Sequence, residues 1–351
     1  MKRLITKLFA AGMLISAAAL MFTSCTKEGP QGPAGPAGKD GTNGQDANAT
    51  CTQCQNFSDS IVAKIFQYNG SQHATGSTAF ENRNMCAPCH TSQGFIEVVA
   101  TGADTTTAEI LDPAPINCRT CHNIHATYTT ADWAVKTTAS YTLRIDHSIT
   151  MDFPGNGGTG NLCGRCHQAR TTSPWVTNPT GTDSLKVSSM RWGPHYGGQS
   201  LVLGGKGAFE FGTAYTNTSH KDNASCTSCH GAKAVGDLTG GHSLWIGNEE
   251  EGDNLFGCNI SGCHNGNMTQ AKMEEKQAAI EEKLTALQDA LIAKKIIDSV
   301  THYVIVPKKY TQKQLAVVWN YKLVYYDRSM GMHNYAYTND MLDASLAALN
   351  E

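Results

Sequence analysis

Residues 118–122 read Cys-Arg-Thr-Cys-His, and a second histidine, His125, follows three residues later. The same C-x-x-C-H pattern occurs three more times, at Cys86-Ala87-Pro88-Cys89-His90, Cys163-Gly164-Arg165-Cys166-His167 and Cys226-Thr227-Ser228-Cys229-His230. This spacing is typical of covalent haem c attachment, in which two thiols bond one haem and the adjacent histidine binds its iron. Four copies predict a chain that carries several haems.

A fifth motif has a wider loop, since Cys258 and Cys263 are separated by four residues and His264 follows. That loop can still span both attachment points of a haem, so we count it as a fifth site and number the motifs 1 to 5 in chain order. A histidine directly after the second cysteine, five times, argues against disulfides or zinc sites.

A further pair, Cys51 and Cys54, has the thiol spacing, but Gln55 stands where the histidine is expected. Two interpretations remain open for this pair. It is either a sixth haem site that has lost its usual ligand or a disulfide in a former haem site. The expected cofactor content is therefore five haem c groups, or six if Cys51 and Cys54 also bind one.

The N-terminus has the pattern of an export signal. Lys2, Arg3 and Lys7 precede a short apolar run, residues 8–22, which leads to Thr23-Ser24-Cys25. Small residues before one unpaired cysteine predict a lipoprotein signal peptide over 1–24, with Cys25 as the lipidated first residue of an outer-membrane lipoprotein. The alternative is ordinary cleavage nearby, which leaves Cys25 a free thiol. Either version exports the chain, and its domain is expected on the periplasmic or the cell-surface face.

Residues 29–46 repeat glycine at every third position, with proline after the first three glycines. This collagen-like pattern is compatible with a homotrimer, because only glycine fits the crowded axis of three wound chains. A run this short is also compatible with an extended stalk, and we favour the stalk over the trimer. Residues 25–50 are therefore assigned to a lipid-anchored collagen-like stalk.

The remainder divides by composition into a haem-binding domain, 51–267, and a helical segment, 268–351. The first part is rich in Gly, Thr, Asn and Pro, which predicts loops, with helical turns after each motif and one short helix over 58–68. We expect stacked haems to form its core. The second part predicts helices at 268–299, 311–326 and 339–349, the first with a heptad stripe of apolar residues. The expected fold is mainly α with extensive loops, a haem-stacked core and a long C-terminal helical segment that packs on it and supplies an iron ligand.

Each iron also needs a ligand on the opposite face, and eight histidines lie outside the five motifs. Neutral imidazole is a good ligand for haem iron, so this surplus predicts bis-histidine ligation. His125 cannot bend back to the iron of His122 and should reach a neighbouring one. His147 and His302 are left out. The candidates for the distal position are His73, His125, His195, His220, His242 and His333.

The chain resembles multihaem c-type cytochromes of the doubled-motif kind, and is similar in style to the ammonia-forming nitrite reductases and decahaem electron-transfer proteins. The resemblance covers about residues 51–350. It rests on residues 86–95, residues 161–170 and the tail Asp327-Arg328-Ser329-Met330-Gly331-Met332-His333-Asn334. In such proteins the histidine of the tail G-x-H-N is a distal ligand, which implies that role for His333.

The expected function is electron transfer along closely packed bis-histidine haems at the cell envelope, between a redox protein that donates and one that accepts, with extracellular transfer as one form of it. A formal charge of -3 gives no indication of nucleic-acid binding. The alternative is a reductase of nitrite, hydroxylamine or a similar small oxidised compound at one open haem. The nitrite reductases carry lysine in place of one motif histidine, and this chain has no C-x-x-C-K. Gln55 would have to take that role, so we predict no catalytic residue.

Overall fold

The computed structural model describes residues 59–76, 82–235, 239–248 and 252–351, which all belong to one compact unit. The predicted lipidation residue Cys25, the collagen-like run and the pair Cys51 and Cys54 lie outside the described residues. The α-helices are α3 (Asp59–Asn69), α4 (Ala87–His90), α5 (Ser92–Thr101), α6 (Cys118–Cys121), α7 (Gly160–Gly164), α8 (Gln199–Gly204), α9 (His220–Asn223), α10 (Cys226–Cys229), α11 (Gln270–Ala293), α12 (Gln312–Asp327) and α13 (Tyr335–Asn350). The 3₁₀ turns are η1 (Thr130–Trp133), η2 (Gly155–Gly158) and η3 (Gly241–Ser243).

Within the described residues, six short strands form three separate two-stranded antiparallel sheets, which the sequence did not predict. The strands are β1 (Tyr141–Leu143), β2 (Asp146–Met151), β3 (Ser184–Val187), β4 (Gly247–Asn248), β5 (Gly252–Asp253) and β6 (Lys308–Thr311). β1 pairs with β2, β4 pairs with β5, and β3 pairs with the distant β6. In the β3–β6 pair, Val187 is opposite Lys308 and Ser184 is opposite Thr311, so β6 connects the C-terminal helices to the middle of the chain.

Helical turns were expected after each motif, and α5 follows motif 1 in this way, but most of the turns lie on the motif residues themselves. α6 and α10 each contain both cysteines of one motif, whereas α4 contains only Cys89 of motif 1 and α7 contains Cys163 of motif 3. Asn117 and Ser225 are the N-cap residues of α6 and α10, and each forms a capping box. The side chain of the cap accepts from the backbone N–H of the third helical residue, and the side chain of that residue accepts from the backbone N–H of the cap. A single helical turn brings the two thiols of C-x-x-C to one side.

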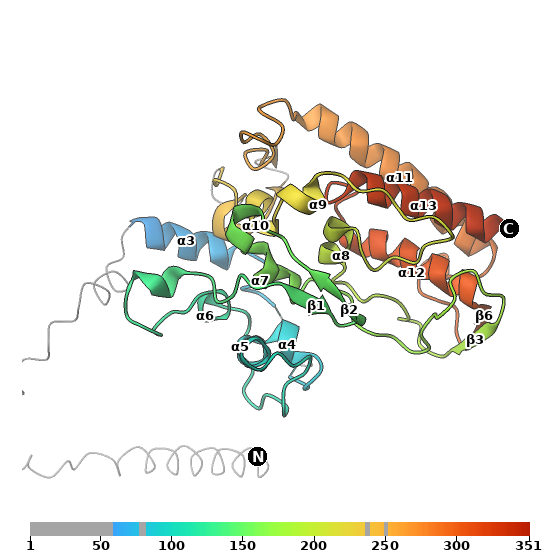
Figure 1. Ribbon diagram of the computed structural model, residues 1–351, viewed down its shortest axis with the longest axis horizontal. Coiled ribbons are helices and arrows are strands. Elements are labelled where there is room, and N and C mark those ends of the chain that lie inside the picture. The colour runs from blue at the N-terminus through green and yellow to red at the C-terminus, as the bar shows by residue number, and fades with distance from the viewer. Residues whose placement is uncertain (1–58, 77–81, 236–238, 249–251) are drawn as a thin grey trace, which may run out of the picture. The chain divides into compact units, whose positions relative to one another are not determined.

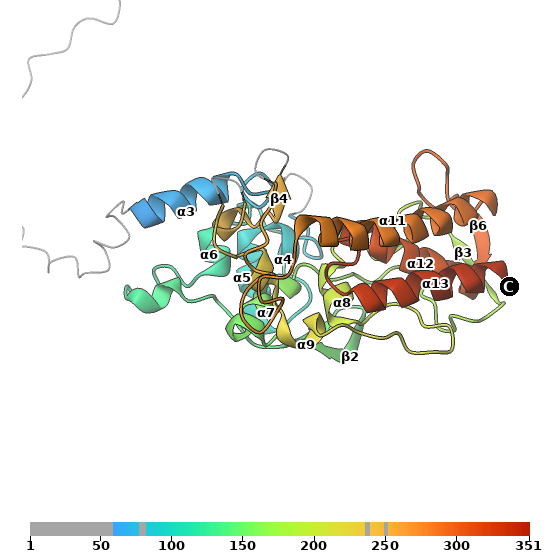
Figure 2. The same cartoon turned by 90° about the horizontal axis from the view of Figure 1, so that it is seen from above.

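The C-terminal helices confirm the predicted helical segment, with bounds shifted by a few residues. α11, α12 and α13 contact one another, and Figures 1 and 2 both show them running side by side. The predicted heptad stripe of α11 is buried at Met273, Ile280, Leu284, Leu287 and Leu291. α12 is buried along most of its length, and its buried residues include the polar Asn320, Lys322 and Asp327.

The main hydrophobic core consists of side chains drawn from residues 141–349, so α11 packs within the chain. Trp192, Trp319 and Tyr321 are among its largest fully buried side chains. The sequence assigned the core of 51–267 to haems; within that range, residues 141–215 contribute side chains to a protein core that they share with the C-terminal helices. Because α12 brings the missing apolar surface from far along the chain, the local composition did not reveal it.

In the described part of the chain, no helix is both long enough and apolar enough to span a bilayer. The helix predicted over 58–68 is confirmed as α3.

Candidate functional site

Ten histidines form five close pairs, and every pair joins one motif histidine to one candidate from elsewhere in the chain. The ring centres are 6.4 Å apart for His90–His195, 6.2 Å for His122–His242, 6.1 Å for His167–His73, 6.2 Å for His230–His333 and 6.0 Å for His264–His220. These partners come from α9, η3, the turn after α3 and two loops, so the fold assembles the pairs from distant segments.

The separation within each pair fits a shared iron. An iron bonded to one nitrogen of each imidazole at about 2 Å would hold the ring centres roughly 6 Å apart. The described histidines, cysteines and acids do not gather in groups of three or more, as a bare metal ion would require. The donor set therefore fits haem, whose porphyrin supplies the remaining ligands.

Hydrogen bonds at Nδ1 hold several of these rings with Nε2 directed away. Nδ1 of His122 lies 2.7 Å from the carbonyl oxygen of Trp133, and Nδ1 of His230 lies 2.8 Å from that of Leu244. His220 similarly meets the carbonyl of Met332 at 3.0 Å. When one ring nitrogen donates to a carbonyl, the other is the unprotonated nitrogen that binds metal.

Burial favours the neutral form of several of the paired imidazoles. It lowers the pKa of His73 and of His195 to about 4, with further contributions from neighbouring charged groups. Burial also lowers the pKa of His167, His230 and His242. Neutral imidazole is the form that coordinates iron, so the fold presents these rings ready for a haem.

His333 behaves differently, because its partner is a carboxylate. Nδ1 of His333 lies 2.6 Å from Oδ1 of Asp327, whose side chain is fully buried. Burial lowers the pKa of His333, but the charge and the hydrogen bond of Asp327 outweigh burial and raise it overall. The sequence predicted no role for Asp327, although it is the only acidic residue of α12 and lies six residues before a candidate ligand.

Cysteine thiols from different motifs face one another. A hydrogen bond with the Cys166 thiol lowers the pKa of Cys89 to about 6, and a hydrogen bond with Cys229 lowers that of Cys258 to about 7. A hydrogen bond from Cys226 raises the pKa of Cys163. Motif 3 therefore meets motif 1 through Cys166 and motif 4 through Cys163.

Distances to backbone atoms show that the same motifs are neighbours. The Sγ of Cys166 lies 3.6 Å from the carbonyl oxygen of Pro88 in motif 1, and the Sγ of Cys226 lies 3.7 Å from that of Gly160 beside motif 3. A Cβ on Gly257, next to motif 5, would lie 2.8 Å from the Cα of Cys229 in motif 4. The spatial order is motif 1, motif 3, motif 4, motif 5.

Motif 2 lies to the side of this row. The hydroxyl of Thr120, within motif 2, donates to that of Ser92, two residues after motif 1, at 2.8 Å. Burial raises the pKa of Cys121 to about 12, and the nearby Cys163 of motif 3 contributes to this. Motif 2 is thus close to both motif 1 and motif 3.

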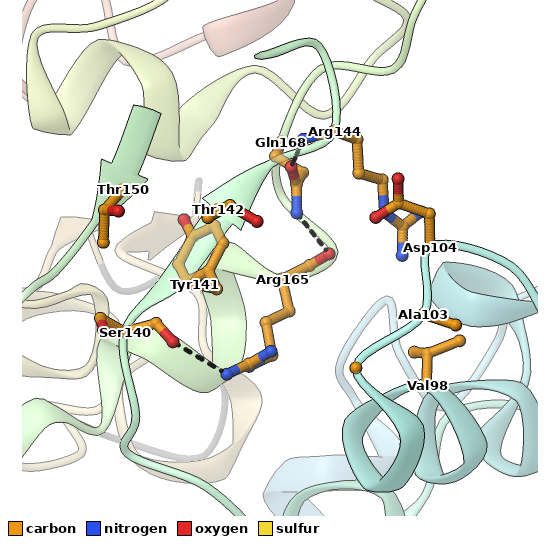
Figure 3. Close-up of a pocket in the computed structure, with 11 residues that line it drawn as sticks. Val98, Ala103, Asp104, Ser140, Tyr141, Thr142, Arg144, Thr150, Arg165 and Gln168 are labelled. Carbon is orange, nitrogen blue, oxygen red and sulfur yellow. Dashed lines mark hydrogen bonds and ion pairs between the residues drawn. The ribbon is translucent and has the colours of Figure 1, made fainter. Parts of the chain in front are cut away.

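A cavity of about 340 Å³ opens beside motifs 1 and 3, lined by Arg144, Arg165, Tyr141, Gln168 and Asp104 among others (Figure 3). Arg144 donates to the Sγ of Cys89 at 3.4 Å, and Arg165 donates to the carbonyl oxygens of residues 139 and 140 at 3.2 Å. Guanidinium groups bind carboxylates in two-pronged geometry, which suits the propionates that every haem carries.

Three histidines stay outside the pairs. His125, a predicted distal ligand, is exposed and stacks on Tyr128, with 5.5 Å between ring centres. His147 lies 3.0 Å from a carboxylate oxygen of Asp104 and is 63% exposed, and His302 packs on Tyr325. The structure therefore brings together five of the six distal candidates and leaves His125 without a motif histidine.

Comparisons with known proteins give one fold relationship. The chain is similar to a solved structure described as the outer cell wall cytochrome OcwA, with 18% sequence identity and a TM-score of 0.51. The similarity covers 82% of this chain and 50% of that one, so the chain spans about half the length of this structural neighbour. No family model matches, and no curated protein matches. At this identity the likeness shows a cytochrome-like fold.

Proposed function

We propose that this protein is a multihaem c-type cytochrome that carries electrons along five closely packed bis-histidine haems. The observation that carries the proposal is the set of five histidine pairs, each with a separation that fits an iron between the rings. Both axial positions are then filled by protein, which leaves no position for a substrate. Each haem supplies a one-electron couple, while the chain holds, orients and insulates it.

In this proposal the motif cysteines bond the haems, the motif histidines are the proximal ligands, and His73, His195, His220, His242 and His333 are the distal ones. Arg144 and Arg165 bind propionates beside motifs 1 and 3. The haems of motifs 1, 3, 4 and 5 form a row, and the haem of motif 2 is a branch beside motif 3. Facing thioether bonds bring neighbouring porphyrin edges together, so electrons pass from haem to haem rather than through long stretches of protein.

The branch at motif 2 and the end of the row at motif 5 are the expected points of electron exchange with other proteins. Among the described cysteines, only Cys118 of motif 2 and Cys263 of motif 5 are exposed, and the other eight are partly buried. An exposed thioether edge lets a donor or acceptor haem approach closely. We therefore assign the docking positions of the donor and acceptor redox proteins to motif 2 and motif 5.

An envelope location completes the proposal. The export signal over 1–24, the lipidated Cys25 and the stalk over 25–50 would tether the haem domain to the outer membrane. The structural neighbour is an outer cell wall cytochrome, which supports an extracellular or envelope position. Trimerisation through the collagen-like run remains part of the proposal as the less favoured assembly.

The pair Cys51 and Cys54 would add a sixth haem, and His125 is the histidine still free to serve it. This is the one place where an iron with a missing ligand, and hence the reductase alternative, would be located. Haem counting by intact mass separates the two proposals, since five haems leave no site for the reductase and six require it to be tested.

Replacing each distal histidine by alanine tests the ligand assignment. H73A, H195A, H220A, H242A and H333A should each convert about one fifth of the haem from low spin to high spin without loss of any haem, because attachment depends on the thioether bonds and the proximal histidine. H147A is the matched control and should leave every haem low spin. Unchanged low-spin spectra in any of the five variants would remove that histidine from the ligand set.

A further inference from the structure

The hydrogen bond between His333 and Asp327 distinguishes one histidine pair from the others. Nδ1 of His333 lies 2.6 Å from Oδ1 of Asp327. The side chain of Asp327 is fully buried, and His333 is 21% exposed. In the described part of the chain, His333 alone forms an ion pair with Asp327, so this carboxylate has no lysine or arginine that neutralises it.

The end of α12 and the turn after it build this contact. Asp327 is the last residue of α12, and Arg328 and Gly331 have positive φ angles of 61° and 89° that reverse the chain. Ser329 lies inside the turn, where its hydroxyl donates to Oδ2 of Asp327 and accepts from the backbone N–H of His333 at 3.2 Å. Both carboxylate oxygens are therefore held, and the ring of His333 has a fixed direction.

At the same ring nitrogen, four other paired histidines, His122, His167, His220 and His230, have neutral partners. His122 and His230 meet backbone carbonyls, and Nδ1 of His167 lies 3.2 Å from Oε1 of Gln199. A neutral carbonyl orients the ring but adds no charge. A buried carboxylate draws the imidazole proton toward itself and makes the other nitrogen a stronger donor to the metal.

We propose that Asp327 is a positioning residue that makes the haem between His230 and His333 harder to reduce than a neutral partner at the same ring nitrogen would. The inference rests on the proposed function, since it requires a haem at this pair. A stronger ligand and a buried negative charge both favour ferric iron, which carries one more positive charge than ferrous iron. Ser329 supports the effect by fixing the carboxylate.

The position of this haem gives the effect a role. Motif 4 stands between motif 3 and motif 5 in the row, so electrons that travel from one end to the other must cross it. A haem that resists reduction here divides the row into two segments that each hold electrons. The geometry thus assigns to motif 4 the step that controls exchange between the two ends.

The test is a redox titration of D327N, followed by optical and low-spin EPR signals. Asparagine still accepts the hydrogen bond but carries no charge. In D327N, one of the five midpoint potentials should rise by at least 59 mV, which is a tenfold change in the ratio of reduced to oxidised haem for a one-electron couple. The component that moves should be the one that becomes high spin in H333A, and D327E should keep the low potential.

D343N is the matched control, because Asp343 is an acid on α13 that is 54% exposed and pairs with Lys283 at 2.6 Å. It should leave all five potentials unchanged. Equal shifts in D327N and D343N, no shift in D327N, or conversion of one haem to high spin in D327N would each overturn the tuning role. Failure of the proposed function looks different, since the unmodified protein would then lack five low-spin haems.

Discussion

Asn334 follows directly after a proposed iron ligand and joins three segments through its buried side chain. Its Oδ1 accepts from the backbone N–H of Thr218 at 2.9 Å and from that of Tyr337 at 3.4 Å, which caps the start of α13. Its Nδ2 donates to Oδ1 of Asn217 at 2.8 Å and to the carbonyl of Leu203 at 3.3 Å. N334A removes all of these bonds at once.

The expected cost follows from these contacts. Loss of a helix N-cap costs about 0.5–2 kcal/mol, and each buried polar group left without a partner costs about 1–3 kcal/mol. With the cap and at least one buried group lost, N334A should lower the free energy of unfolding by about 3 kcal/mol. Urea unfolding followed by circular dichroism measures this as a lower midpoint with an unchanged slope.

N339A is the control for this prediction. Asn339 lies inside α13, is partly exposed, and accepts from Nζ of Lys283 at 2.8 Å. Alanine is a better helix former than asparagine, so N339A should change stability by less than about 0.5 kcal/mol. The reasoning is refuted if N334A and N339A unfold at the same urea concentration.

Three further changes test other parts of the account. In G94A the new Cβ would lie 2.5 Å from the carbonyl carbon of Ala87, so the free energy of unfolding should fall by about 1–3 kcal/mol and haem occupancy at motif 1 should drop. Urea unfolding and mass spectrometry measure these two effects. In the control G76A the nearest neighbour of the new Cβ is at 3.6 Å, so both measurements should match those of the original protein. Burial lowers the pKa of Lys322 to about 8 in the folded state, below its value in the unfolded chain. Between pH 8 and pH 10.5 the unfolded chain therefore binds one more proton than the folded protein, and the free energy of unfolding should rise with pH by roughly 2–3 kcal/mol. Urea unfolding should not find this rise in K322M. C25S should keep all haem signals but release the protein from membranes in fractionation, and continued membrane association would contradict the lipid anchor.

The sequence indicated the chemistry proposed for the site, but not which segments of the chain the fold brings together to form it. The motifs indicate the cysteines and histidines that we propose bind haem, because attachment is local and requires only two thiols and a histidine within a few residues. The stripe of α11 was equally visible, since Ile280 and Leu287 repeat at helical spacing on one face. Both signals are short in range and independent of the rest of the fold.

Long-range features were not predictable in this way. The surplus of histidines indicated bis-histidine ligation, but nothing near His73 or His242 in the chain says which iron each one faces. The β3–β6 pairing joins Val187 to Lys308, and no local period encodes it. His125 illustrates the limit, because its closeness to His122 suggested a bridge to a neighbouring iron, whereas the structure stacks it on Tyr128.

The central claim is that every one of five irons has two histidine ligands. EPR of the oxidised protein, combined with a carbon monoxide difference spectrum of the reduced protein, tests it most directly. The account predicts five low-spin haems and no carbon monoxide binding. A high-spin haem that binds carbon monoxide would contradict the account and would indicate an open iron where a substrate is reduced.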